Sequence, residues 1–162
     1  MTTWRALDAP ALRDLVTRLR TLPWQWRASD VPAVAESLGW QVTYRSPEGG
    51  ALASTGEFGG REVTVVGRAG AVQTVSVRVS DSAGQRTPEG RAFLQDAFVD
   101  SVAALTELLG TPTKRRLGDQ PTVRWRDDDQ TVSVIGFGNS ILVAIAPTAI
   151  QDHLDIADGG DR

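Results

Sequence analysis

The sequence TPEGRAFLQDAFVDSVAALTELLGTP, residues 87–112, decides the fold class because it encodes one long amphipathic helix. Thr87 is a suitable cap, and Pro88 fits the first helical position, where no backbone N–H is needed. Gly110 and Pro112 end the helix. Residues recurring every three or four positions form a nearly continuous, mainly apolar stripe: Leu94, Ala97, Phe98, Ser101, Val102, Leu105, Leu108 and Leu109. We therefore predict a helix over Pro88–Leu109 that packs on a sheet.

Two shorter helices are predicted near the N-terminus. The first covers Asp8–Arg20, where Asp8 is the cap and the apolar residues repeat with helical spacing. Pro23 stops it. The second covers Asp30–Leu38 and ends at Gly39, a residue type that is common just after a helix.

The remaining periodicity is that of strands, in which apolar and polar residues alternate. Short turns separate most of these segments, which indicates antiparallel pairing. The expected strands are residues 40–45, 51–58, 62–68, 72–80, 122–126, 131–135 and 140–146. We predict an α+β fold with a mostly antiparallel sheet of about seven strands, two N-terminal helices and one long central helix on one face. The two strand blocks would be halves of one sheet, and a short helix is expected over Thr148–Leu154.

Length and composition favour one globular domain. The chain has 162 residues, 41% of them hydrophobic and 23% charged, and it contains no cysteine. We expect one domain over residues 1–154 and a flexible acidic tail over 155–162. No apolar run approaches the roughly 20 residues of a membrane helix, and the first residues do not resemble a secretory signal. We therefore expect a cytoplasmic protein without a membrane partner.

Several kinds of chemistry are disfavoured, and we expect no catalytic residue, metal or cofactor. The single histidine, His153, lies near the C-terminus, where a surface position is the simplest interpretation. Residues 136–140 resemble a glycine-rich phosphate loop, but a strand follows where a helix would be needed. The net charge of −3 argues against a nucleic-acid partner, because proteins that bind nucleic acids usually present a basic surface. Scattered glutamates, Glu57 and Glu62 among them, cannot be placed in space from the sequence.

Three groups of residues are candidates for contact with a protein partner. Trp24 and Trp26 lie in the connector between the first two helices, and exposed tryptophan and arginine are enriched at binding hot spots. Arg124 and Arg126 form a basic strip with residues 114–116. The third group is the acidic turn Asp127, Asp128 and Asp129. The simpler alternatives are core aromatic residues, a solvated strand face and an ordinary hairpin turn.

The segment from Gly110-Thr111-Pro112 through Arg124-Trp125-Arg126 to the apolar strand Ile141–Ile145 resembles an uncharacterised family of small actinobacterial proteins. The resemblance covers residues 88–155. It implies a role like that of immunity proteins or dedicated chaperones encoded beside secreted toxins, and it assigns no functional residue. Our hypothesis is a non-enzymatic immunity protein that neutralises a toxin by occlusion. A secretion chaperone, or an enzyme or small-molecule binder with a tryptophan-lined pocket, remains the alternative.

Overall fold

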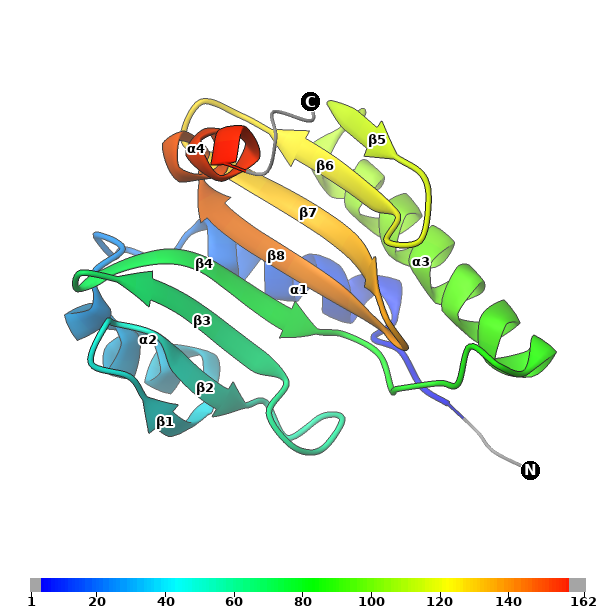
Figure 1. Cartoon of the computed structure of the whole chain (residues 1–162), viewed down its shortest axis with the longest axis horizontal. Coiled ribbons are helices and arrows are strands. Elements are labelled where there is room, and N and C mark those ends of the chain that lie inside the picture. Colours follow the sequence, from blue (N-terminus) through cyan, green and yellow to red (C-terminus); the bar gives the residue numbers. More distant parts are fainter. Residues whose placement is uncertain (1–3, 158–162) are drawn as a thin grey trace.

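The computed structural model describes residues 4–157, which form one eight-stranded sheet and four α-helices (Figure 1). The helices are α1 (Ala9–Arg20), α2 (Val31–Leu38), α3 (Pro88–Leu109) and α4 (Thr148–Ala157), and a 3₁₀ turn, Ala28–Asp30, precedes α2. The strands are β1 (Gln41–Arg45), β2 (Ala51–Ser54), β3 (Val63–Arg68), β4 (Ala71–Arg78), β5 (Lys114–Arg116), β6 (Thr122–Arg126), β7 (Gln130–Phe137) and β8 (Ser140–Pro147). The α+β class and the antiparallel sheet are confirmed.

The sheet consists of two four-stranded meanders joined side by side. Its order is β1-β2-β3-β4-β8-β7-β6-β5, and every neighbouring pair is antiparallel. The join lies between β4 and β8, where Val75 pairs with Ile145 and Val77 with Val143. Helices precede each meander. Because β4 pairs with β8, the two strand blocks are halves of one sheet, as the sequence predicts.

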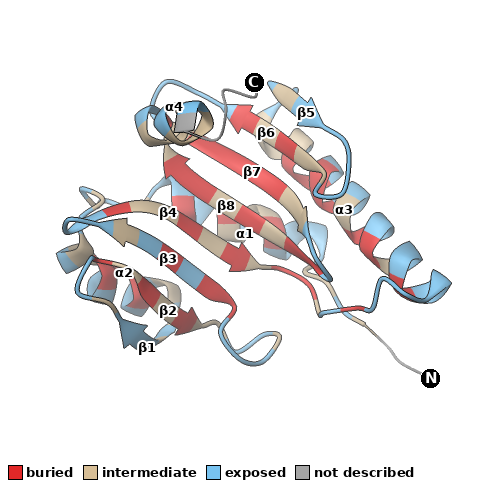
Figure 2. Ribbon diagram, viewed as in Figure 1, coloured by how far each residue is buried: buried red, intermediate tan, exposed pale blue. Residues whose placement is uncertain are grey.

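The helices α1, α2 and α3 cover one face of the sheet, and the buried residues lie between these helices and the strands (Figures 1 and 2). On α3, Leu94, Val102 and Leu105 are buried, and Leu105 is 0% exposed. Phe98 and Leu109 also pack on the core but are only partly buried. The predicted stripe therefore faces the sheet as expected.

Helix ends follow the predicted signals. Asp8 Oδ1 accepts a hydrogen bond from the Ala11 N–H at 2.9 Å, and Thr87 Oγ1 accepts one from Gly90 at 3.0 Å. Gly90 is also required by close packing, since a Cβ atom there would lie 1.8 Å from the Gly84 carbonyl oxygen. The polar loop before α3 can thus rest directly on the first turn of the helix.

Most boundaries lie within two residues of the prediction, and three differences are larger. The strand expected over residues 51–58 ends at Ser54, because residues 55–62 form a loop around the buried side chain of Glu62. The short edge strand β5 was missed, since three consecutive basic residues show no apolar alternation. The last helix reaches Ala157, three residues into the segment expected to be a flexible tail; residues 158–162 lie outside the described part. No helix within residues 4–157 is long and apolar enough to cross a membrane.

Candidate functional site

The face of the sheet opposite α1, α2 and α3 is largely open (Figure 1). One row of outward-facing residues crosses all eight strands in register: Tyr44, Leu52, Thr64, Ser76, Ala144, Ser133, Arg124 and Lys114. The four residues in its middle are short and uncharged. Tyr44 and Val66 on this face are 53% and 43% exposed. An antiparallel sheet with one covered face and one accessible face is an ordinary architecture that leaves room for a partner.

Helix α4 covers the end of this open face at β6 and β7. Arg124 NH1 lies 2.8 Å from Asp155 Oδ2, and Arg126 NH2 lies 2.8 Å from Asp152 Oδ2. The spacing of the two ion pairs follows from the two kinds of element. Residues two apart on a strand point to the same side, as do residues three apart on a helix, so both arginines can face both aspartates. The hydrogen bond and charge of Asp152 raise the pKa of Arg126, and the same hydrogen bond lowers the pKa of Asp152. The two predicted arginines are therefore engaged within the chain.

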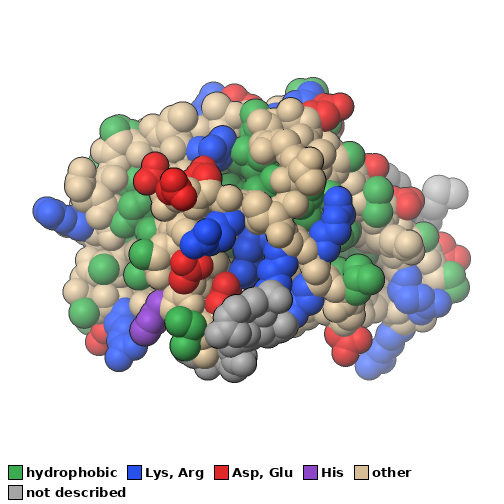
Figure 3. Space-filling model, turned by 90° about the horizontal axis from the view of Figure 1, so that it is seen from above, with side chains coloured by type: hydrophobic (Ala, Val, Ile, Leu, Met, Phe, Trp, Pro, Cys, Tyr) green, Lys and Arg blue, Asp and Glu red, His purple; other side chains and the backbone are tan. Residues whose placement is uncertain are grey.

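The two ion pairs neutralise Arg124 and Arg126 but not the other basic residues of the surrounding surface. Figure 3 shows Lys and Arg side chains gathered on the side of the molecule that carries β5, β6 and α4. A cavity of about 380 Å³ lies between α4 and these strands, with Lys114 in its wall. The Nε atom of Arg124 is buried and has no acceptor among the described residues.

The β6–β7 turn uses one of its three aspartates for structure. Asp127 Oδ1 accepts hydrogen bonds from the N–H groups of Asp129 and Gln130, and its other carboxylate oxygen pairs with Arg20. Burial alone would raise the pKa of Asp127, but these hydrogen bonds and the Arg20 charge lower it. The side chains of Asp128 and Asp129 are exposed and make no hydrogen bond or ion pair within residues 4–157.

The connector that carries Trp24 and Trp26 is tightly packed rather than free. The two indole rings are 4.5 Å apart, tilted by 36°, and both pack partly buried against the core. The Trp24 Nε1 atom is buried without an acceptor in the described part of the chain. Trp26 adopts a φ of 57°, unusual for a bulky residue, while its carbonyl oxygen accepts from Val72. These contacts attach the connector to the β3–β4 turn.

The structure brings the predicted candidates to one end of the sheet. The first residues of β4 and β7 lie at the same end as the last residues of β8, because Val75 pairs with Ile145 and Gln130 with Pro147. Arg20, in the last turn of α1 and just before the connector, pairs with Asp127 at 3.2 Å. The basic strip, the acidic turn and the tryptophan connector thus occupy neighbouring elements, and Asp128 and Asp129 at the acidic tip form no ion pair within residues 4–157.

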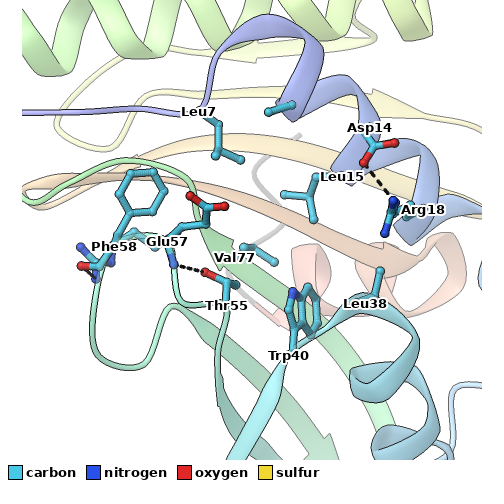
Figure 4. A pocket seen from close by; sticks show the side chains of 12 residues that line it. Leu7, Asp14, Leu15, Arg18, Leu38, Trp40, Thr55, Glu57, Phe58 and Val77 are labelled. Carbon is cyan, nitrogen blue, oxygen red and sulfur yellow. Dashed lines mark hydrogen bonds and ion pairs between the residues drawn. The ribbon is translucent and has the colours of Figure 1, made fainter.

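A second feature, a cavity of about 220 Å³, lies between α1, α2 and the β2–β3 loop. Figure 4 shows Leu15 and Leu38 on one side of it, Val77 as its floor and the Trp40 indole rising into it. The Glu57 carboxylate points into the same space. Asp14 and Arg18 form an i,i+4 ion pair at its rim, with 3.0 Å between Arg18 Nε and Asp14 Oδ2.

The loop that forms one wall is organised by the buried carboxylate of Glu62, which is only 2% exposed. The N–H groups of Thr55, Glu57 and Phe58 and the hydroxyl groups of Ser54 and Thr55 all donate to it. Burial would raise its pKa, but these hydrogen bonds, led by that from Phe58, lower the pKa to about 2. A glutamate directly before an apolar strand, after a Ser-Thr-Gly segment, was the signal in the sequence, but nothing distinguished it from other glutamates.

No described residues form a metal centre: no group of three His, Asp or Glu side chains within residues 4–157 is placed to hold an ion. His153 lies exposed on α4, as expected for a surface histidine.

Comparison with known proteins places the chain in a family. Residues 10–147 match a family of unknown function (DUF6301), and the chain belongs to this family. The matched region contains α1 to β8 and ends where α4 begins. No curated protein and no solved structure matches the chain significantly. The expectation of an uncharacterised family is confirmed, whereas nothing in these comparisons links it to toxin-immunity proteins.

Proposed function

We propose that this protein is a non-enzymatic binding protein that occludes a protein partner, in the manner of an immunity protein that neutralises a secreted toxin. The partner contacts the open face of the sheet and the acidic β6–β7 tip beside it. The contact surface combines Tyr44 and Val66, which are exposed on the strands, with the carboxylates of Asp128 and Asp129.

The observation that carries the proposal is the negative charge at this tip that the turn itself does not require. One aspartate is enough to order the turn, and Asp127 supplies its hydrogen bonds. The fold gives Asp128 and Asp129 no ion-pair partner within residues 4–157. Exposed charges of one sign accelerate the approach of an oppositely charged protein and make its binding sensitive to salt. The tip therefore fits a partner with a basic surface.

The neighbouring open face supplies uncharged contact area that the acidic tip alone does not. Interfaces depend on contact area with few charges at their centre and polar groups at the rim. The middle of the outward-facing row contains Thr64, Ser76 and Ala144, which present a shallow and uncharged surface, whereas the next residue, Ser133, is buried. Charges lie towards the edge, at Arg124 and Lys114 in the last strands of the row and at Asp128 and Asp129 on the tip. This distribution suits an occluding interface better than a catalytic site.

The partner tested is the purified product of the adjacent gene. Its association with the wild-type protein is measured by surface plasmon resonance at low and high salt. A double variant, Asp128→Lys with Asp129→Lys, should lower the association rate by about tenfold or more at low salt. The matched control, Asp96→Lys with Asp100→Lys on the exposed side of α3, makes the same charge change and should bind as wild type.

A second variant tests the open face independently. Thr64→Arg places a long side chain outward in the middle of the row without entering the core. Binding should fall by at least about tenfold, since a bulky group at an interface centre prevents close packing. If both folded variants bind as tightly as wild type, this surface is wrong. Loss of the partner's toxic activity on binding distinguishes an immunity protein from a secretion chaperone, which would leave that activity unchanged.

A further inference from the structure

We propose that the cavity between α1, α2 and the β2–β3 loop binds a small organic cation, a protonated amine or guanidinium attached to a single ring or a short alkyl chain. This cavity lies on the helix-covered side of the sheet, away from the open sheet face. Binding of such a ligand does not depend on the proposed protein partner.

The size and walls of the cavity define the apolar part of this ligand. Its volume of about 220 Å³ is below the roughly 300–1,000 Å³ of sites for drug-sized ligands, whereas about 150 Å³ is enough for benzene. Apolar side chains from three elements form most of its surface, with Leu15 on α1, Leu38 on α2 and Val77 on the sheet (Figure 4). One ring or a short chain therefore fills it.

The charge of the ligand follows from Glu57 and Trp40. The Glu57 carboxylate points into the cavity and has no hydrogen-bond or ion-pair partner within residues 4–157 (Figure 4). A cation placed there gains an ion pair, and the indole of Trp40 offers an aromatic face that also attracts cations. An anionic ligand would instead meet a carboxylate at the mouth of the cavity that forms no ion pair with a described residue.

The guanidinium groups around the cavity already have partners. Arg18 pairs with Asp14, which keeps this positive charge neutralised at the rim. Arg78 NH2 donates to the carbonyl oxygens of Phe58 and Gly59, and Arg5 NH2 donates to that of Glu57. None of these arginines forms an ion pair with the Glu57 carboxylate. Glu57 and Arg78 are therefore the lining charges that form no ion pair within residues 4–157, and Arg78 already uses its N–H donors on backbone carbonyl oxygens of the loop.

The loop that presents Glu57 is held in place before any ligand arrives. Both the Glu57 and Phe58 N–H groups donate at 2.9 Å to the buried Glu62 carboxylate. Arg5 stacks over the Phe58 ring, 5.1 Å from its centre, and fixes the loop from the outside. Such preorganisation lowers the ordering cost of binding. Glu62 acts as a positioning residue, and Glu57 contacts the ligand.

The test uses three probes of similar shape: 2-phenylethylamine, which is cationic; 2-phenylethanol, which is neutral; and phenylacetate, which is anionic. Binding to the full chain is measured by ¹H–¹⁵N NMR titration, following the amides of Thr55 and Glu57 and the Trp40 indole N–H. Three variants accompany the wild type. Glu57→Gln removes the charge, Ala11→Met fills the cavity from α1, and Glu36→Gln on α2 is the charge-matched control outside the cavity.

The amine should bind saturably with shifts confined to the cavity, and the alcohol and the acid should bind at least about tenfold more weakly. Glu57→Gln should weaken the amine by a similar factor and leave the alcohol unchanged. Ala11→Met should weaken both, and Glu36→Gln neither. The inference is overturned if amine and alcohol bind equally, if Glu57→Gln has no effect on the amine, or if the amine shows no saturation up to about 10 mM.

Discussion

Replacing Glu62 by Gln should destabilise this protein far more than its single lost charge would on the surface. The side chain keeps its size, but the amide NH₂ group cannot accept a hydrogen bond. At least one of the donors now bound, such as the N–H groups of Glu57 and Phe58, therefore loses its acceptor inside the β2–β3 loop. A buried donor left unsatisfied costs about 1–3 kcal/mol.

The lowered pKa of Glu62 expresses the effect of the same hydrogen bonds as a free energy. The folded protein lowers it from 4.5 to about 2. A difference of about 2.5 units corresponds to about 3 kcal/mol of stability that depends on the ionised form. Because the folded-state pKa is below the unfolded one, this contribution is fully present above pH 4.5. It is lost progressively as the pH falls towards 2.

The assay is urea unfolding of the wild type and Glu62→Gln at pH 7 and pH 3. At pH 7 the variant should be less stable by about 3 kcal/mol. At pH 3 the difference should shrink by about 2 kcal/mol, because the unfolded wild-type carboxyl group is then protonated. Glu36→Gln, an exposed control, should show neither effect. A Glu62→Gln protein within about 0.5 kcal/mol of wild type at pH 7 would refute the assigned hydrogen-bond network.

Three further predictions concern the scaffold. Leu105→Ala should cost about 2–5 kcal/mol in urea unfolding, since Leu105 is fully buried, whereas Leu117→Ala, at an 89% exposed position, should change little; equal effects would contradict the orientation of α3. Gly90→Ala should destabilise the protein although alanine has the better helix propensity, because the alanine Cβ atom would meet the Gly84 carbonyl oxygen. An unchanged melting temperature would show that this contact is wrong. Prolonged dialysis against EDTA should leave the melting temperature unchanged; a drop reversed by magnesium or calcium would reveal a metal site at Asp127–Asp129.

The fold could be predicted from local signals because apolar residues recur at helical or strand spacing in most elements, and most elements end at recognisable residues. The α3 stripe and its Thr87 cap lie as the sequence indicates. The apolar strand β8 is central, as its apolar residues on both faces suggested. The edge strand β5 could not be found in this way, since Lys114–Arg116 consists of three basic residues and offers no apolar side chain that would alternate with polar ones.

The candidate surfaces were harder to predict because their state depends on distant partners. Arg124 and Arg126 looked available in the sequence, but they meet acids 31 and 26 residues away on α4. Trp24 and Trp26 lie outside any periodic element, and only the fold shows that both rings pack on the core. The role of Glu62 depends on five donors in a loop whose shape no local pattern specifies.

The most direct test of the proposed function is hydrogen–deuterium exchange of the full chain with and without the purified product of the adjacent gene. Exchange reports which backbone amides become protected when a partner covers them. An occluding interface on the open face predicts added protection in the β6–β7 turn and in β3, β4 and β8, with α3 unchanged. Protection confined to α1 and α3, or no change at saturating partner, would contradict the account.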